Sequence, residues 1–343
     1  MTRSEINPNR NQTSVDAVNA CIVSIIIPTF NRKDLLVEAV ASGLAQTYPH
    51  IEVVIVDDGS TDGTDKMVAA RLRAEWAGKV VYLYKENGGT SSAKNAGMQK
   101  AQGAYIQFLD SDDVLRPEKV SRQMASIRSA SEIVDCCVCY GRLGTLEAGW
   151  HNGMRIGEVC PNSALYIQRQ CGRNVHVICT NAPLWRADFL IGFPTWREDL
   201  NVSEEWEYYI RLLSRNPLLT AVPEDLFWVR EHAGDQLTKS FGNLRNARST
   251  YRAIRTVAEL LRKGPFWNSA VGQGLILRAR TTYINLLRSV CTEDLREFEE
   301  WLLELARTVP SRRIVAVITM RRCIGSKAFL KLFDLYSGMR SKS

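Results

Sequence analysis

The sequence predicts an α/β protein with an open, mostly parallel β-sheet flanked by helices, followed by a helical C-terminal extension. Three observations lead to this fold class. Short apolar runs rich in β-branched residues alternate with segments of helical periodicity between residues 21 and 109. Polar residues follow each of these runs directly. From about residue 244 onward, long segments have the apolar spacing of helices.

The first part of the chain is expected to alternate strictly between strands and helices. The opening strand spans Cys21 to Pro28, because CIVSIIIP is apolar at nearly every position, as in a parallel strand that is buried on both faces. Further strands are expected at 51–56, 80–84 and 104–109, with helices at 34–46, 65–76 and 92–101 between them. Right-handed crossovers would bring the carboxyl ends of these strands to one edge, where ligands of such sheets bind.

The remaining elements follow the same reasoning with less regular spacing. A helix is expected at 119–129, and apolar runs near Cys136 and Leu165 indicate a continuing sheet with insertions. Four long helices are expected at 244–263, 275–290, 293–308 and 314–336. Residues 1–20 are polar and are expected to form a flexible N-terminal tail.

Composition excludes several classes of protein. With 343 residues, 45% hydrophobic and 24% charged, the chain is neither wholly disordered nor fibrous. It has no run of 18 apolar residues, so no transmembrane helix is expected, and residues 1–20 lack the apolar core of a secretory leader. The nine cysteines, an odd number, favour reduced thiols and a cytoplasmic location. Cys136, Cys137 and Cys139 are expected to be buried strand thiols rather than metal ligands.

Positive charge is concentrated in the C-terminal third. Residues 239–343 hold 20 Lys/Arg against 8 Asp/Glu, a net charge of +12, whereas residues 1–238 have a net charge of −5. One helical stripe carries four arginines, Arg245, Arg248, Arg252 and Arg255. The basic helices suggest peripheral binding to an anionic membrane surface, and the alternative is a solvated face packed on the rest of the protein. No nucleic-acid partner is expected, because the region lacks any zinc-finger spacing or aromatic RNA-binding pattern.

An acidic cluster follows the fourth expected strand. Asp110, Ser111, Asp112 and Asp113 place three carboxylates within four residues, which repel one another unless a cation neutralises them. A hard divalent cation held by one or two carboxylates and by substrate phosphates fits this pattern. The alternative is an acidic turn that caps the next helix.

Two further strand ends carry candidate binding residues. Asp57 and Asp58, in the run DDGS, suit contacts with a base or a ribose, although the same residues are common in turns. The run NGGTSS opens a helix that bears Lys94 and Asn95, where backbone amides and a cation would face a phosphate. A plain helix N-cap is the alternative for this second run.

Four runs follow one another along the chain: VSIIIPTFNR, IVDDGSTDGT, NGGTSSAKNAG and GAYIQFLDSDD. Together they strongly resemble the family 2 glycosyltransferases, enzymes with the GT-A fold. The resemblance is dense from Val23 to Val120. It implies inverting transfer of a sugar from a nucleotide donor, usually a UDP-sugar, with Mn²⁺ or Mg²⁺ as cofactor. It also implies a GT-A-like catalytic domain at 21–240, comprising a nucleotide-sugar-binding half at 21–120 and an acceptor-binding half at 121–240, before the basic helical region at 241–343.

The resemblance assigns roles to individual residues. The metal would be held by Asp112 first, and by Asp110 and Asp113. His232, in a stretch that resembles the arginine/histidine segment after the family's catalytic helix, would lie near the diphosphate or the metal, and a structural or solvated histidine is the alternative. Asp58 would meet the nucleotide base beside Asp57. Lys94 stands where the family more often has arginine, which removes bidentate phosphate binding but keeps the charge. The donor site as a whole would comprise Pro28, Thr29, Asn31, Arg32, Asp57, Asp58, Gly88, Lys94, Asn95, Asp110 and Ser111.

An inverting transfer needs a base that removes the proton of the acceptor hydroxyl. In the family this base is commonly the Asp of a Glu-Asp pair that opens a helix, and the run SEEWEYYIR from Ser203 to Arg211 fits that frame with Glu205 at the base position. Asp199 is the second candidate and lacks the spacing that follows. First-turn acids behind an N-cap Ser203 are the structural alternative.

These observations predict a glycosyltransferase that acts on a glycan or a polyprenyl-diphosphate-linked acceptor in cell-envelope biosynthesis. It is expected to add a single sugar, because the family's processive QxxRW signature is absent. It would act in the cytoplasm, peripherally at the inner face of the membrane. One alternative is a non-catalytic nucleotide-sugar-binding or scaffold protein, with Glu205 in place of Asp as the sign of lost activity. A sugar nucleotidyltransferase is disfavoured, because no glycine-rich basic loop follows the first strand. The sugar, the acceptor and the oligomeric state stay open.

Overall fold

The computed structural model describes residues 21–144, 154–172, 178–191, 193, 195–231, 244–288, 292–309 and 312–331. The chain divides into two compact units, each of which draws on separate stretches of sequence. The first, here called the sheet unit, comprises residues 1–159, 180–195 and 218–231. The second, the helical unit, comprises residues 160–179, 196–217 and 232–343.

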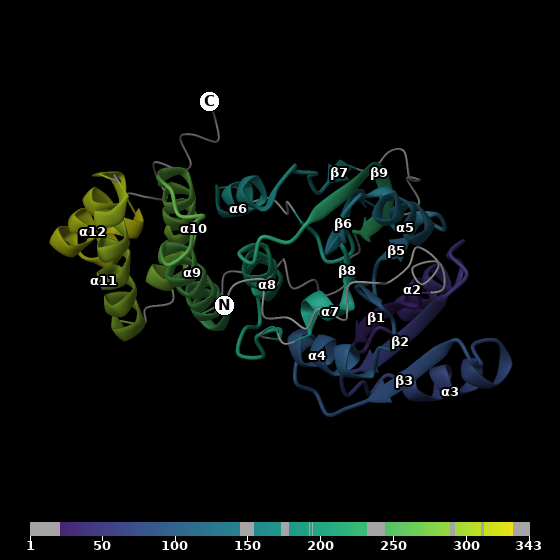
Figure 1. Cartoon of the computed structure of the whole chain (residues 1–343). Helices are drawn as coiled ribbons and strands as arrows, with labels where there is room; N and C mark the ends of the chain where they lie inside the picture. Colours follow the sequence, from purple (N-terminus) through teal and green to yellow (C-terminus); the bar gives the residue numbers. More distant parts are fainter. Residues whose placement is uncertain are drawn as a thin grey trace. The chain divides into compact units, whose positions relative to one another are not determined.

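The described part of the sheet unit contains one nine-stranded sheet (Figure 1). Its path runs β3-β2-β1-β4-β8-β6-β9-β5, and β7 pairs with β6 beside this path. The strands are β1 (Val23–Thr29), β2 (Ile51–Asp57), β3 (Val80–Tyr84), β4 (Tyr105–Phe108), β5 (Val114–Leu115), β6 (Cys136–Gly144), β7 (Met154–Ile156), β8 (Leu184–Arg186) and β9 (Leu219–Arg230).

The first four strands of the sheet unit, β3, β2, β1 and β4, are parallel neighbours. Every residue of β1 is buried, as the continuous apolar run predicted. The crossovers between them are α2 (Lys33–Leu44), α3 (Thr64–Ala74) and α4 (Thr90–Lys100). Helix α4 approaches β1 so closely at Gly97 that a side chain there would overlap Ile26. The predicted alternation and fold class are confirmed.

The second half makes the sheet mixed. Strand β8 pairs antiparallel with β4 and β6, β5 pairs antiparallel with β9, and β6 pairs parallel with β9. Helices α5 (Lys119–Ser129) and α7 (Ala187–Leu190) belong to this half. Cys136, Cys137 and Cys139 are fully buried in β6, so their placement as buried strand thiols is confirmed.

The helical unit corrects one sequence prediction. The apolar run near Leu165 is a helix, α6 (Ser163–Gly172), and not a strand. Its buried positions recur every three to four residues, and this helical period outweighs the apolar character of the run. The other helices are α8 (Glu204–Leu213), α9 (Leu244–Arg262), α10 (Ser269–Arg288), α11 (Thr292–Thr308) and α12 (Arg312–Ile324).

Helix α12 is also shorter than the continuous segment predicted at 314–336. It ends before Gly325, whose φ of +78° lies in the left-handed region, and helical backbone resumes at 326–331. Among the helices described in the structure, none is both long and apolar enough to cross a membrane.

Candidate donor-binding and catalytic sites

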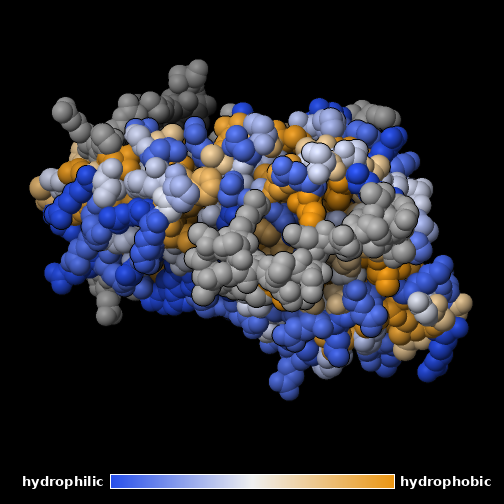
Figure 2. Space-filling view, in the orientation of Figure 1, coloured by the Kyte–Doolittle hydropathy of each residue, from blue (hydrophilic) through white to orange (hydrophobic). Residues whose placement is uncertain are grey.

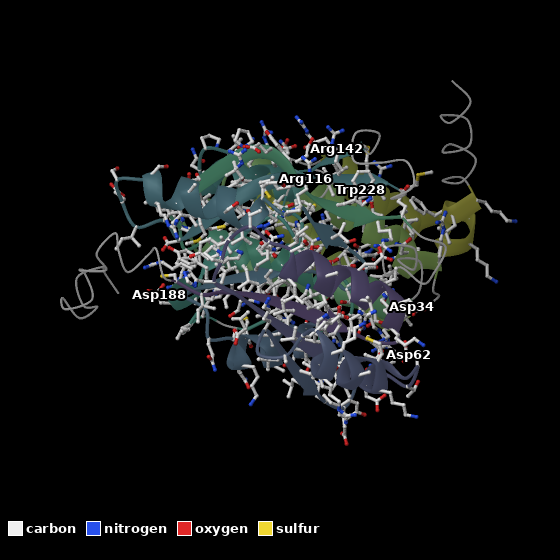
Figure 3. All side chains as sticks on the ribbon, turned by 90° about the vertical axis from the view of Figure 1, so that its right-hand side faces the viewer. Asp34, Asp62, Arg116, Arg142, Asp188 and Trp228 are labelled. Carbon is white, nitrogen blue, oxygen red and sulfur yellow. The ribbon has the colours of Figure 1, made fainter. Side chains whose placement is uncertain are left out.

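The loops that follow β1 and β2 are tied together by Asn31. Its φ of +51° is uncommon for a residue with a side chain. Its backbone N–H donates to Oγ of Ser60 (2.9 Å), and its Oδ1 accepts from the N–H of Thr61 (2.7 Å). The backbone N–H of Lys33 donates to Oδ2 of Asp62 (3.0 Å), and Figure 3 labels Asp62 and the neighbouring Asp34 in this region. Asn31, predicted in the donor pocket beside Pro28, Thr29 and Arg32, therefore shapes the strand-end loops.

Asp57 and Asp58 are both buried and bind other strand-end groups. Asp57 accepts hydrogen bonds from the Tyr82 hydroxyl (2.7 Å) and the Ser60 N–H (2.8 Å). Burial of Tyr82, together with its bond to Asp57, raises the pKa of that phenol. These side-chain hydrogen bonds of Asp57 therefore lie within β2, its following turn and β3.

The Asp58 carboxylate organises the turn that opens α4. It accepts from the backbone N–H groups of Gly88 (3.0 Å) and Gly89 (2.7 Å) and from Nζ of Lys85 (2.6 Å). Gly89 has a φ of +88°, which side chains rarely adopt, so the glycine is required by the turn. The predicted contact of Asp58 with a nucleotide base stays a prediction.

Four charged side chains converge near the carboxyl ends of β1 and β4 and on α4. Arg32 pairs with Asp112 at 2.7 Å between Nη1 and Oδ2. Lys94, buried in α4 beside Asn95, has its Nζ 3.7 Å from Oδ1 of Asp110. The Asp110 side chain is 36% exposed and that of Asp112 is 13% exposed, so both are partly buried and Asp110 is the more accessible of the two. Partial burial raises the pKa of the Asp110 carboxyl group, and the positive charge of Lys94 acts against this rise. The negative charge of Asp112 raises the pKa further, and the positive charge of Arg32 lowers it.

The third carboxylate, Asp113, faces the protein interior. Its Oδ2 accepts from Nδ2 of Asn181 (2.6 Å), and its Oδ1 accepts from the N–H of Arg230 (2.9 Å). Burial, with the nearby charges of Asp112 and Asp110, raises the pKa of Asp113 well above its usual range. Both oxygens thus have protein donors, and Asp110 and Asp112 are the two carboxylates better placed for a ligand.

Sequence reasoning did not identify Asn181. It lies 71 residues from Asp110 along the chain, and its Oδ1 accepts from the Asp110 N–H (3.1 Å). No local motif marks this asparagine, and the pairing of β8 with β4 brings its segment to residues 110–113, here called the acidic loop.

The carboxylates at this site supply part of the ligands that a hard divalent cation needs. Among the residues that the structure describes, no three His, Cys, Asp or Glu side chains are placed to hold a metal together. Two carboxylates, Asp110 and Asp112, with phosphate oxygens of a ligand, match the coordination that Mg²⁺ commonly has in proteins. His232, the predicted fourth ligand, lies outside the described residues.

In the helical unit, the candidate base Glu205 lies in the first turn of α8, partly exposed. The residue before the helix, Ser203, has a φ of +65° and makes no side-chain cap bond; its hydroxyl lies 3.2 Å from that of Thr250 instead. The structure therefore does not support Ser203 as a conventional side-chain N-cap. Glu207 receives two hydrogen bonds from Arg211, at 2.7 and 3.0 Å, which explains the arginine of this helix.

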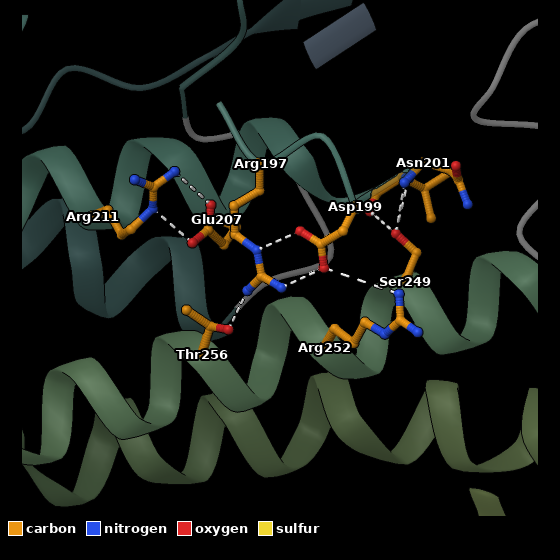
Figure 4. A network of polar contacts seen from close by, with 9 residues as sticks. Arg197, Asp199, Asn201, Glu207, Arg211, Ser249, Arg252 and Thr256 are labelled. Carbon is orange, nitrogen blue, oxygen red and sulfur yellow. Dashed lines mark hydrogen bonds and ion pairs between the residues drawn. The ribbon is translucent and has the colours of Figure 1, made fainter. Parts of the chain in front are cut away.

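The second candidate base, Asp199, is held by arginines (Figure 4). Nε and Nη2 of Arg197 donate to its two oxygens at 2.8 and 2.6 Å, and Arg252 lies 4.0 Å away. The bond from Arg197 lowers the pKa of Asp199. A carboxylate with a lowered pKa is a weaker proton acceptor, so this geometry favours Glu205 over Asp199 as the base.

The arginine stripe of α9 has partners inside the helical unit. Arg248 pairs with Asp294 at 2.7 Å and Arg255 with Glu297 at 2.6 Å, both on α11. Arg245 donates to the side chain of Asn201 (2.9 Å). On the face shown in Figure 2, hydrophilic residues predominate, with hydrophobic ones scattered between them. The stripe is therefore accounted for by contacts within this unit.

A mixed sheet with acidic and basic side chains at the carboxyl ends of its parallel strands is characteristic of α/β proteins that bind ligands at this edge. Within that class, residues 24–190 match Glycosyl transferase family 2, and this part of the chain belongs to that family. The resemblance seen in the sequence is thereby confirmed.

Relatives of known sequence share this part of the chain. An uncharacterized glycosyltransferase of Rickettsia prowazekii is 44% identical over 103 residues, 30% of this chain and 31% of the relative. The putative teichuronic acid biosynthesis glycosyltransferase TuaG of Bacillus subtilis is 42% identical over 103 residues, 30% of this chain and 40% of TuaG. The matched regions thus cover less than half of these relatives.

Solved structures resemble the whole chain in fold. S. aureus TarS 1-349 in complex with UDP-GlcNAc superimposes with a TM-score of 0.66 at 18% identity, covering 92% of each chain. The mannosyltransferase PcManGT of Pyrobaculum calidifontis, in complex with GDP-Man and Mn²⁺, has a TM-score of 0.55 at 15% identity, covering 91% of this chain and 83% of that one. These likenesses confirm the GT-A-like fold.

Proposed function

We propose that this protein transfers one sugar from a nucleotide-sugar donor, a UDP-sugar, to a hydroxyl of a glycan or polyprenyl-diphosphate-linked acceptor, with inversion at the anomeric carbon. The observation that carries the proposal is the convergence of Arg32, Lys94, Asp110 and Asp112 at the carboxyl ends of β1 and β4 and on α4. Two cations and two carboxylates suit a diphosphate and the divalent cation that accompanies it.

The comparisons support the choice of donor and acceptor class. TarS has been solved in complex with UDP and with UDP-GlcNAc, and PcManGT with GDP-Man and Mn²⁺. The name of TuaG refers to teichuronic acid biosynthesis. A UDP-sugar donor, a Mn²⁺ or Mg²⁺ cofactor and an envelope-polysaccharide acceptor follow for this chain as proposals.

In the proposed reaction, Lys94 and Arg32 bind the diphosphate oxygens, and Asp110 and Asp112 would hold the divalent cation. When bound, that cation supplies positive charge that stabilises the leaving nucleoside diphosphate. Glu205 takes the proton of the acceptor hydroxyl as its oxygen attacks the anomeric carbon. The new C–O bond forms as the bond to the diphosphate breaks, and the electron pair departs with the nucleoside diphosphate.

The proposal predicts release of nucleoside diphosphate from one member of a panel of nucleotide sugars, with Mn²⁺ or Mg²⁺ and not with EDTA. Asp112→Ala should lower the rate by about a hundredfold or more, because a cation ligand is lost, and Glu205→Gln by a similar factor with little change in donor affinity. Product release is measured by coupled assay and donor binding by calorimetry, with membrane extract as a source of acceptor.

Asp188→Asn is the matched control, because Asp188 is an exposed carboxylate that pairs with Arg186 on the surface. Donor binding without turnover under all conditions would instead support the non-catalytic scaffold. No binding of any donor would refute the proposal for the site itself.

Peripheral membrane association at the cytoplasmic face belongs to the proposal as well, and the exposed Lys327 and Lys331 support it. The ion pairs of Arg248 and Arg255 reduce the charge left for lipid. Flotation with liposomes that contain anionic lipid, compared with neutral liposomes, tests it. Failure to float with anionic vesicles refutes membrane binding and leaves the transferase proposal intact.

A further inference from the structure

We infer that Asn181 is a positioning residue that fixes Asp110 and Asp112, the two carboxylates of the acidic loop that meet Lys94 and Arg32, for nucleotide and cation binding. The inference rests on the proposed function, because it concerns the same site. It adds a residue from the segment before β8 that neither the sequence motifs nor the comparisons identify.

The side-chain amide of Asn181 holds the loop at both of its ends. Oδ1 accepts from the N–H of Asp110 (3.1 Å), and Nδ2 donates to Oδ2 of Asp113 (2.6 Å). The orientation of the amide is defined chemically, because a backbone N–H only donates and a carboxylate only accepts. Within the loop, the Asp113 N–H donates to the Asp110 carbonyl at 3.0 Å, which closes the turn.

As a result, the three carboxylates of the acidic loop lie in different environments. Asp113 is 3% exposed and is held inward by Asn181 and by the Arg230 N–H. Asp110 and Asp112 are left at the open edge, where they meet Lys94 and Arg32. Asn181 thus acts on the binding groups through the backbone between them.

Asn181 is itself held by a buried polar network. Nε2 of Gln107 donates to the Asn181 carbonyl (3.1 Å), and Nε2 of Gln123 donates to the carbonyl of Ala182 (2.9 Å). The amide oxygens of both glutamines accept from Nζ of Lys119, which is fully buried. A network with its partners satisfied restricts the position of its members, so the Asn181 amide is presented to the loop from a rigid base.

A reciprocal exchange of two side chains tests this inference. Asn181→Asp still accepts from the Asp110 N–H but places a carboxylate against Asp113. Asp113→Asn still accepts from the Arg230 N–H but places an amide NH₂ against that of Asn181. In the double variant Asp113→Asn/Asn181→Asp, the new amide at position 113 donates to the new carboxylate at position 181, and all three hydrogen bonds are possible again.

The readouts are the affinity of UDP in the presence of Mn²⁺, by calorimetry, and the affinity of Mn²⁺ in the presence of UDP, by electron paramagnetic resonance. Each single variant should lose about tenfold to a hundredfold in both affinities, the range typical of residues that orient metal ligands. The double variant should recover to within about threefold of the parent, since its hydrogen bonds are restored. Asn268→Asp, which keeps the cap of α10 at Val271, is the matched control and should leave both affinities unchanged.

The outcomes separate the inference from the function on which it rests. If the parent protein binds no UDP with Mn²⁺, the proposed function fails, and the inference fails with it. If the parent binds and folded Asn181→Asp binds equally well, Asn181 has no positioning role. If the double variant stays as weak as the single ones, the Asp113 charge itself is required and the inference is overturned.

Discussion

At the scale of residues, the two candidate bases differ in what surrounds them. Asp199 has two short hydrogen bonds from Arg197, whereas Glu205 lies in the first turn of a helix whose Glu207 and Arg211 bind each other. Motif spacing favoured Glu205, and the Arg197 contact now supplies a physical reason. The role of Glu205 stays a prediction that the turnover of Glu205→Gln will test.

The Asp199 contact predicts a pH dependence of stability. Because the pKa of Asp199 is lowered from its usual 3.8, its ion pair contributes fully above about pH 4 and is lost as the pH falls through the lowered pKa. Asp199 is nearly half exposed, so solvent screening keeps the contribution below about 1 kcal/mol. Urea unfolding at about pH 7 and about pH 3 should show a smaller loss of stability for Asp199→Asn than for the parent.

The matched comparison is Asp188→Asn, whose carboxylate is also about half exposed but whose contacts with Arg186, both 3.1 Å, are longer than the 2.8 and 2.6 Å contacts of Asp199 with Arg197. It should follow the parent more closely than Asp199→Asn does between the two pH values. If Asp199→Asn and the parent lose equal amounts of unfolding free energy between the two pH values, the role of the Arg197 contact is contradicted.

At the scale of elements, α9 holds the loop that leads into α8. The hydroxyl of Ser249 accepts from the N–H groups of Asn201 (2.9 Å) and Val202 (3.2 Å) and donates to the Val202 carbonyl (2.8 Å). Figure 4 shows this serine beside the arginine–aspartate contacts of the same loop. The basic helix thus positions the segment before the candidate base, a role that its charge did not indicate.

We therefore expect Ser249→Ala to destabilise the protein. Two N–H groups would lose their acceptor in a buried region, which costs about 1–3 kcal/mol. Chemical unfolding measures this loss, and Ser269→Ala, at an exposed position of α10, should change stability by less than about 0.5 kcal/mol. If Ser249→Ala is as stable as the parent, the loop does not depend on α9.

At the scale of the whole molecule, ligand binding should stabilise the native state. A nucleoside diphosphate with Mn²⁺ at about a hundred times its dissociation constant adds about 2.7 kcal/mol to the free energy of unfolding, provided that only the folded protein binds it. Melting temperature measured with UDP and Mn²⁺ should rise by a few degrees, and by much less in Asp112→Ala. An equal rise in both proteins would place the ligand away from the acidic loop.

Local sequence patterns were sufficient to predict the first half of the fold and to propose a candidate site at its strand ends. The alternation of apolar runs with helical periods specifies β1 to β4 and their crossovers, because burial on both faces of a parallel sheet requires continuous apolar strands. That topology brings the strand ends together, and the family resemblance then singled out Arg32, Lys94 and Asp112 as candidate residues there.

The partners of these groups depend on packing between segments that are distant in the sequence. Asn181 binds Asp110, which is 71 residues away in the sequence, and Ser249 binds Asn201, which is 48 residues away. The local spacing of apolar residues therefore does not predict either contact. The antiparallel strands of the sheet, the helix at Leu165 and the pairing of α9 arginines with α11 likewise depend on which distant segments pack together. Local periodicity reflects the environment of each segment, whereas a hydrogen-bond partner is set by packing between segments that are far apart in the chain.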